Sequence, residues 1–546
     1  MSKLAFTSNR SFIDMQWLLG FFLAAFLLWG ISLGNVPLRD WDEATRALIA
    51  REIYRTGNWL HPTLQGQPYL LKPPLMDWSI ALSYQLWGVR ELTTRLPGAF
   101  FTACGVPLLY LVARELFYQS PPAVFAATVY LTLLPVVRHG RLAMLDGMAV
   151  SFFLLLLLCL LKARQDRRWA IGIGICLGLI TLTKGILAIL LGAIAFLFLL
   201  TNRLKNKPLP PSPLTPNPSP LTPNPSSLIP HPSSLLNSPY FWLGLLLGNA
   251  PVAAWYIAQW HYYGATFWQV HFQAQSLERI SQAVEGNSGS PWYYCLELLK
   301  YSWPWLLFWP GGLALAWQKR WTSWSSLVLV GTVSYLGTIS LMSTKLPWYI
   351  MPLYPFLALA VGAQLSCFWA NSKSYPRILV GSLGFLAFAG VGGSVYFVVA
   401  DPQPMLILMG GVVLLTMSTA AWQVQKQNRI FIPILLGGMY LTLTLLMTSQ
   451  SWLWELNEAF PVKPVAVLLQ EQTPPGTVVY TSFAYRRPSL DFYSDRQVIP
   501  ADFTTLEKLR STSAYLLLDE STLTALQLPN SISVGSAEAF TLVKIQ

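Results

Sequence analysis

Long uncharged apolar runs recur along the whole chain and constrain its fold more than any other feature. Only 11% of the 546 residues are charged and 53% are hydrophobic, which disfavours a water-soluble globule. About thirteen runs approach the length of roughly 20 residues that crosses a bilayer. They lie near 15–34, 96–117, 121–137, 147–161, 169–183, 185–201, 240–259, 303–317, 324–342, 347–370, 376–400, 404–422 and 430–450. The sequence therefore predicts an all-α polytopic membrane protein.

The basic residues predict how these segments are oriented. Lys and Arg in short loops stay on the cytoplasmic side of a membrane. If the run 15–34 is a retained signal anchor and the N-terminus is cytoplasmic, every compact basic cluster falls on the cytoplasmic side. The clusters are Lys162, Arg164, Arg167 and Arg168; Arg203, Lys205 and Lys207; Lys319 and Arg320; Lys373 and Arg377; and Lys426 and Arg429. We therefore attribute the net charge of +12 to membrane topology and not to nucleic-acid binding.

The composition divides the chain at about residue 460. Residues 1–459 hold the apolar runs, whereas 460–546 are more polar and alternate helix-like with strand-like segments, which predicts a small α/β domain. An odd number of spans places this domain outside the cytoplasm, together with the first outer loop at 35–95. The unit PLTPNPS is repeated in tandem within about 206–238. So much Pro, Ser and Asn predicts a disordered cytoplasmic insertion, with a proline-motif ligand as the alternative.

The first outer loop opens with three carboxylates in four positions, in the stretch RDWDEATRALIAREI. Asp42 and Glu43 precede apolar residues at helical spacing, and Gly57 follows as a stop signal. Acidic residues at a helix N-terminus interact favourably with the helix dipole, so a structural role is one interpretation. A catalytic role is the other, and this stretch alone leaves both open.

Side chains from other segments are predicted on the same outer face. They are Tyr69 and Lys72 in QPYLLKPPLMDW, Asp146 in RHGRLAMLDGM, Lys184 in LTKG, and Lys345 and Tyr349 in STKLPWY. A single lysine at the end of a span often snorkels to the surface without any function. Snorkelling does not explain why carboxylates and lysines from separate segments share the face that the basic clusters select. Their convergence therefore indicates a functional site.

The residue types in this set suit one chemistry better than others. A carboxylate can take the proton of a hydroxyl acceptor as a new bond forms. Lysines and arginines can anchor a phosphate and stabilise its charge as it leaves. Together they indicate glycosyl transfer from a lipid phosphate. The chain contains no phosphate-binding glycine loop, no GxSxG and no HExxH, and its His and Cys residues do not have the spacing of metal ligands.

These residues resemble those of the membrane-embedded GT-C glycosyltransferases that use polyprenyl-phosphate sugars. The stretches DEATRALIAREIYRTGNW and KPPLMDW carry most of the resemblance, LTKG and KLPWY support it, and it runs from about Leu38 to Tyr354. The lipid A aminoarabinose transferases are the most similar group, and the protein O-mannosyltransferases are more distant. The resemblance implies a GT-C fold of about 13 transmembrane helices followed by the α/β domain.

The resemblance also implies roles for individual residues. Asp42 corresponds to the catalytic carboxylate, Glu43 to its partner and Asp146 to a second acidic residue of the active site. Tyr69, Lys72, Lys184, Arg279, Lys345 and Tyr349 correspond to positions that line the donor-phosphate pocket. Leu71 and Ser276 stand where the aminoarabinose transferases have a Glu and a His. We therefore predict no metal site, keep a divalent metal as an unsupported alternative, and identify the family without identifying the sugar.

The predicted function is an inverting glycosyltransferase that moves a sugar from a polyprenyl phosphate to a lipid, glycan or protein acceptor. We expect it in the plasma membrane, with the active site and the C-terminal domain on the extracytoplasmic face. A transporter or flippase of lipid-linked sugars is the alternative, and it predicts charges near the membrane midplane and internal repeats. A membrane scaffold with a sensing outer domain is a third interpretation, and it needs none of the polar motifs.

Overall fold

The computed structural model describes residues 2–40, 42–205, 232–371, 375–453, 461–528 and 531–546. The chain forms two compact units, which are described one at a time. The first unit comprises Met1–Ser32, Leu70–Leu75 and Gly98–Trp452. The second comprises Leu33–Tyr69, Met76–Pro97 and Leu453–Gln546. The first outer loop and the C-terminal segment thus belong largely to the same unit.

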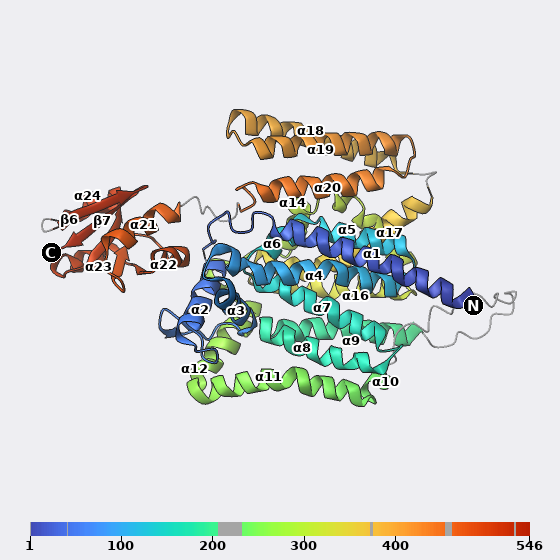
Figure 1. The fold of residues 1–546 in the computed structure, drawn as a ribbon, viewed down its shortest axis with the longest axis horizontal. Helices are drawn as coiled ribbons and strands as arrows, with labels where there is room; N and C mark the ends of the chain where they lie inside the picture. Colours follow the sequence, from blue (N-terminus) through green and yellow to red (C-terminus); the bar gives the residue numbers. More distant parts are fainter. Residues whose placement is uncertain (1, 41, 206–231, 372–374, 454–460, 529–530) are drawn as a thin grey trace. The chain divides into compact units, whose positions relative to one another are not determined.

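Membrane-length helices build the first unit (Figure 1). Within the described residues, nine helices are long and apolar enough to cross a bilayer, or ten if one bent pair counts as a single span. The nine are α1 (Ser2–Gly30), α4 (Glu91–Phe117), α7 (Leu145–Lys162), α11 (Pro239–Tyr263), α16 (Ser323–Leu341), η6 with α17 (Pro347–Leu353 and Tyr354–Ala370), α18 (Arg377–Val399), α19 (Pro404–Gln425) and α20 (Phe431–Thr448). The predicted polytopic all-α fold is confirmed.

The predicted count of about thirteen spans is not reproduced by this length criterion. The bent pair is α5 (Ser120–Leu131) with α6 (Leu134–Arg141), which meet at 54° beside Pro135. The predicted spans 169–183, 185–201 and 303–317 correspond to shorter apolar helices: α8 (Ala170–Lys184), the Leu187–Thr201 part of α9 (Leu187–Lys205) and α15 (Trp309–Gln318). Helices α8 and α9 are separated at Gly185, whose φ of +45° interrupts the helix.

Helices α8 and α11 run side by side at very short range (Figure 1). A Cβ atom added at Gly178 would lie 1.9 Å from the Gly248 carbonyl oxygen. Only glycine permits this approach, which is a common way for helices to pack in membranes. After α11 the chain continues through α12 (Ala265–Phe267), a π-helix at Trp268–Leu277 and α13 (Glu278–Ser281).

The second unit contains the only sheets in the described part of the chain. The first outer loop forms α2 (Asp42–Thr56), the small hairpin of β1 (Thr63–Leu64) and β2 (Gln67–Pro68), and α3 (Leu75–Trp87). The C-terminal part forms a five-stranded sheet in the order β4-β3-β5-β7-β6, and its elements are α21 (Val462–Gln472), β3 (Val478–Thr481), α22 (Pro488–Ser494), β4 (Gln497–Pro500), α23 (Phe503–Lys508), β5 (Tyr515–Asp519), α24 (Glu520–Leu526), β6 (Ser531–Ala537) and β7 (Phe540–Ile545).

This sheet confirms the small C-terminal α/β structure that the sequence predicts. Strand β3 pairs in parallel with β4 and β5, whereas β7 is antiparallel to β5 and β6. Two apolar clusters, one around Val479 and Leu517 and one around Leu516 and Val543, form its core. Most of the Pro-rich insertion predicted at 206–238 lies outside the described residues. Of its last residues, Pro232–Leu236 form the short helix α10.

Candidate active site

Asp42 and Glu43 begin helix α2 in the second unit, but their environments differ. Glu43 is fully buried, and its Oε1 and Oε2 accept hydrogen bonds of 2.8 Å from Arg95 Nε and NH2. Glu43 Oε2 also accepts a 2.8 Å bond from the Arg39 backbone N–H. Asp42 is only partly buried, and its carboxylate forms no hydrogen bond or ion pair with the described residues. Glu43 therefore anchors the loop, whereas the Asp42 carboxylate stays partly exposed.

Arg95 is the counter-ion of Glu43, and it also binds the backbone of the segment that precedes α2. Its NH1 donates to the Leu33 and Val36 carbonyls at 2.9 and 2.7 Å, and its NH2 donates to the Pro37 carbonyl at 2.8 Å. A buried guanidinium satisfied in this way fixes the chain that leads into α2. Arg95 was not predicted as a site residue, because it lies 52 positions after Glu43 and no local pattern links the two.

A second buried ion pair lies one helical turn after Asp42. Arg46 NH1 is 2.7 Å from Asp77 Oδ2, and Arg46 NH2 donates a hydrogen bond to the Tyr69 hydroxyl. Burial raises the pKa of Asp77 to about 6, although the charge of Arg46 opposes this rise. Burial lowers the pKa of Arg46, but the charges of Asp77 and Asp42 and the hydrogen bond with Asp77 outweigh it and raise the pKa overall. The charge of Asp42 thus acts on this pair.

Tyr69, which the resemblance places in the donor pocket, belongs to this cluster. Its ring centroid lies 4.9 Å from the Arg46 guanidinium carbon, and burial raises the pKa of its hydroxyl, so the group stays protonated. Arg46 and Asp77 were not predicted as site residues. Arg46 stands four residues after Asp42 on the same helix, so the i,i+4 rule was the signal available for it.

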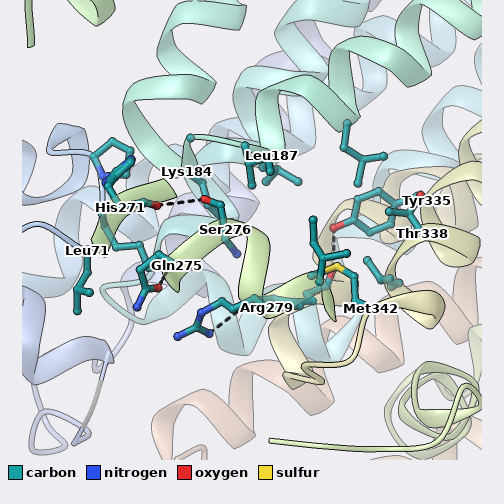
Figure 2. Close-up of a pocket in the computed structure, with 18 of the residues that line it drawn as sticks. Leu71, Lys184, Leu187, His271, Gln275, Ser276, Arg279, Tyr335, Thr338 and Met342 are labelled. Atoms are coloured by element: carbon teal, nitrogen blue, oxygen red, sulfur yellow. Dashed lines mark hydrogen bonds between the residues drawn. The ribbon is translucent and has the colours of Figure 1, made fainter. Parts of the chain in front are cut away.

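The first unit contains a cavity of about 340 Å³ with a polar and an apolar part. Its polar lining residues are Lys72, Lys184, His271, Gln275, Ser276, Arg279, Tyr335, Thr338 and Tyr349. Its apolar lining residues are Leu71, Pro73, Ile186, Leu187, Leu190, Ile280, Ile339, Leu341 and Met342. In Figure 2, Lys184, His271, Gln275 and Arg279 lie on one side, and Tyr335, Thr338 and Met342 on the other. A volume of this size suits part of a small amphiphilic ligand.

Three of the predicted phosphate ligands meet in this cavity with Tyr349. Lys184 Nζ lies 4.8 Å from the centroid of the Tyr349 ring, and Arg279 NH1 donates to the Tyr349 hydroxyl at 3.3 Å. Lys72 Nζ donates to Gln275 Oε1 at 3.1 Å. Three cations at one end of a largely apolar cavity are suited to a lipid-linked phosphate.

Asp146 joins the same group through an ion pair. It lies in the first turn of α7, is buried, and its Oδ1 is 2.6 Å from Lys184 Nζ. The predicted second acidic residue therefore stands beside Lys184, one of the predicted phosphate ligands. It neutralises part of the charge of Lys184 and orients its ammonium group.

Lys345 does not join the group. Its Nζ donates to the backbone carbonyls of Ile339, Ser340 and Met342 at 3.0, 2.7 and 2.5 Å. These carbonyls end α16 and have no partners within the helix, so the ammonium caps the helix. Lys345 is buried and is not one of the residues lining the cavity, and burial lowers its pKa. Its predicted role as a donor-phosphate ligand therefore lacks structural support.

His271 was not predicted as a site residue, yet it organises the cavity wall. His271 Nδ1 lies 2.9 Å from the Leu70 carbonyl and Nε2 lies 3.0 Å from the Tyr256 hydroxyl. Burial lowers the pKa of His271 to about 4, so its ring is neutral and Nδ1 donates to Leu70. His271 and Gln275 stand eight and four residues before the predicted Arg279, and this spacing was the signal available for finding them.

The residues present do not fit a metal site at the positions where related enzymes have a Glu and a His. Leu71 and Ser276 line the cavity there, and Leu71 offers no ligand atom. Both ring nitrogens of the nearby His271 already have hydrogen-bond partners. Among the described residues, no group of three or more His, Cys, Asp or Glu side chains could hold a metal ion.

Comparisons with known proteins identify a family model and several relatives that are similar to this chain. The family model described as dolichyl-phosphate-mannose-protein mannosyltransferase matches residues 71–211. An undecaprenyl phosphate-alpha-4-amino-4-deoxy-L-arabinose arabinosyl transferase of Pseudomonas fluorescens is 28% identical over 387 residues, which is 69% of this chain and 63% of that protein. The corresponding protein of Pectobacterium carotovorum is 27% identical over 438 residues, 76% of this chain and 74% of its own length.

Solved structures show the same architecture. The crystal structure of ArnT from Cupriavidus metallidurans bound to undecaprenyl phosphate aligns with a TM-score of 0.76 at 19% identity, covering 97% of this chain and 98% of that one. The Archaeoglobus fulgidus oligosaccharyltransferase aligns with a TM-score of 0.51 at 10% identity, covering 94% and 68%. These findings confirm the resemblance and the fold class predicted from the sequence. The chain has the GT-C fold of ArnT and is similar in sequence to membrane glycosyltransferases that use undecaprenyl phosphate sugars.

Proposed function

We propose that this chain is an inverting glycosyltransferase that takes a sugar from a polyprenyl-phosphate donor. The observation that carries the proposal is the cavity of the first unit, where Lys72, Lys184 and Arg279 line a space that is otherwise largely apolar. A phosphate requires the cations, and a polyprenyl chain requires the apolar lining. The similarity to transferases named for an undecaprenyl phosphate donor supports the same conclusion.

Each group has a defined task in the proposed reaction. The acceptor oxygen attacks the anomeric carbon, the bond from that carbon to the phosphate oxygen breaks, and the polyprenyl phosphate leaves with the electron pair. Lys72, Lys184 and Arg279 stabilise the charge that develops on the leaving phosphate. Asp42 takes the proton if the acceptor is a hydroxyl, and it orients the acceptor if that group is already an anionic phosphate. No step in this scheme uses a metal ion.

The proposed setting follows from the arrangement of basic loops. The N-terminus is cytoplasmic, and the active site and the C-terminal domain face the extracytoplasmic side of the plasma membrane. The transmembrane catalytic part comprises residues 1–459, and the α/β domain comprises 460–546. The acceptor is a lipid, a glycan or a protein.

Comparative mass spectrometry of cell-envelope lipids and glycoproteins tests the proposal. Cells lacking the protein are complemented with the wild-type chain, with Asp42→Asn, or with Lys300→Met as a control at an exposed lysine of α14 (Tyr293–Tyr301). The wild type and the control should restore a product whose added mass identifies the sugar, and Asp42→Asn should not. The same product from Asp42→Asn cells would refute the catalytic assignment. Sugar translocation across vesicles without any covalent product would instead support a flippase.

A further inference from the structure

In the C-terminal sheet, the order in which successive strands are added reverses beside β3. From β3 the chain crosses to β4 on one side, and it then returns to β5 on the other side of β3. The carboxyl ends of β3 and β5 therefore meet at a switch point, the place where ligands bind in open α/β sheets. The segment that leaves β3 at this edge carries Arg487 and leads into α22.

In this protein the switch-point segment binds the first outer loop of the same chain. Arg487 Nε donates to Asp40 Oδ2 at 2.7 Å, and the Ser489 backbone N–H donates to Asp40 Oδ1 at 2.9 Å. The side chains of Arg487 and Asp40 are only 6% and 2% exposed, so water does not compete for this pair. Both oxygens of the Asp40 carboxylate are thus held by the C-terminal domain.

Helix α22 makes a second set of bonds to the same loop. The Tyr493 hydroxyl accepts a 2.8 Å bond from the Leu38 backbone N–H and donates a 3.0 Å bond to Glu91. The neighbouring ring of Phe492 packs against Leu38, Ala44, Ala47 and Leu48. Arg51, on the last turns of α2, donates to the Phe492 carbonyl at 2.7 Å. The first and last turns of α2 are therefore both attached to α22.

Asp42 lies inside this attachment. Asp40, two residues before it, is bound by Arg487, and Ala44, two residues after it, packs with Phe492. Arg95 and Glu43 fix the backbone locally, whereas the partners of Asp40 among the described residues, Arg487 and Ser489, come from the C-terminal domain. A carboxylate that acts on a substrate loses much of its effect when it moves by about 1 Å.

We propose that the C-terminal domain positions Asp42 for catalysis, with Arg487 and Tyr493 as its positioning residues. This inference rests on the proposed function, and it gives the C-terminal domain a role that the sequence did not reveal. This positioning role differs from a purely structural contact, because it predicts that the variants lose turnover while they remain folded and bind the donor normally.

Steady-state kinetics of the purified full-length protein test the inference. We compare Arg487→Ala and Tyr493→Phe with Arg496→Ala, a matched control whose guanidinium donates to Thr473 and Gln470 within the C-terminal domain. Arg487→Ala should lower kcat by about 10- to 100-fold and leave the donor KM within about threefold, since the cavity residues are untouched. Arg487→Lys should recover part of the loss. Arg487→Ala with Asp40→Asn should be no worse than Arg487→Ala, because the two residues act as a unit.

Several outcomes would overturn the inference. Arg487→Ala could lose no more kcat than Arg496→Ala, or its loss could multiply with that of Asp40→Asn. If Arg487→Ala does not fold, Tyr493→Phe decides the question, because it removes only a hydroxyl, and wild-type kcat in that variant would contradict the proposal. If the wild-type protein transfers sugar and the variants keep the wild-type kcat, the positioning role is refuted but the proposed function is not. A wild-type protein that transfers no sugar refutes the proposed function, and the positioning role with it.

Discussion

Replacing Lys184 by Met tests the donor site most sharply, because this lysine has two partners of opposite kinds. In the wild-type protein, Lys184 Nζ lies 2.6 Å from Asp146 Oδ1, and Lys184 lines the cavity proposed for the phosphate. A hydrogen bond between charged groups contributes about 1.5–3 kcal/mol. Loss of that contact should therefore raise the Kd for undecaprenyl phosphate by about 10- to 150-fold.

The same substitution also leaves Asp146 without its counter-ion. The Asp146 side chain is only 4% exposed, and breaking a buried pair by removing one partner costs about 3–5 kcal/mol. The single variant should therefore be less stable as well as weaker in binding. Lys184→Met with Asp146→Asn removes the uncompensated charge, so it should recover the thermal stability while donor binding stays weak.

Equilibrium binding of radiolabelled undecaprenyl phosphate in detergent, together with thermal unfolding of the same samples, measures both effects. Lys300→Met is the control, because Lys300 also pairs with a carboxylate, at 3.6 Å, but is mostly exposed. A Kd within twofold of wild type in folded Lys184→Met protein would refute the assignment of the cavity. A double variant as unstable as the single one would refute the reasoning about Asp146.

Three further predictions follow from the buried groups. Arg95→Met should destabilise the second unit by about 3–5 kcal/mol, because Glu43 is left buried without its counter-ion. Hydrogen exchange across residues 33–97 would show the loss of protection, and unchanged protection would contradict this prediction. Lys345→Met should lower the melting temperature but leave the Kd for undecaprenyl phosphate within about twofold, because its ammonium caps α16; a tenfold loss of affinity would restore it as a donor ligand. Burial lowers the pKa of His271 to about 4, below its ordinary value, so the neutral ring contributes stability above pH 6.5. This stability is lost as the pH falls towards 4, by roughly 3 kcal/mol in all. The stability of His271→Gln should decline less over this range, and an identical decline would argue against a buried neutral ring.

Local patterns were sufficient to predict most of the membrane helices and three of the seven strands in the described residues. The apolar runs predicted the membrane helices because a bilayer requires a long apolar segment, and the strand-like segments after residue 460 predicted β3, β5 and β7. The start of α2 at Asp42 followed from its acidic first turn. The number of spans was less predictable. A single glycine with positive φ, Gly185, separates α8 from α9, and length alone does not reveal how such short segments are arranged.

The candidate site residues could be named from the sequence, but the contacts that these residues make could not. Lys72, Lys184 and Arg279 do line one cavity, as the resemblance implies. The pairing of Glu43 with Arg95, and the capping of α16 by Lys345, depend on contacts that leave no periodic signal in the sequence. The attachment of Asp40 to Arg487 joins residues 447 positions apart, so only the structure could reveal it.

The most direct test of the central claim is the release of polyprenyl phosphate by the purified protein. The protein is incubated with an undecaprenyl-phosphate-linked sugar and a cell-envelope extract, and the free lipid phosphate and the sugar-modified acceptor are quantified together by mass spectrometry. We expect equal amounts of both products, and both amounts should fall together in Asp42→Asn and Lys184→Met. Modified acceptor formed without release of polyprenyl phosphate, or at the wild-type rate in both variants, would contradict it.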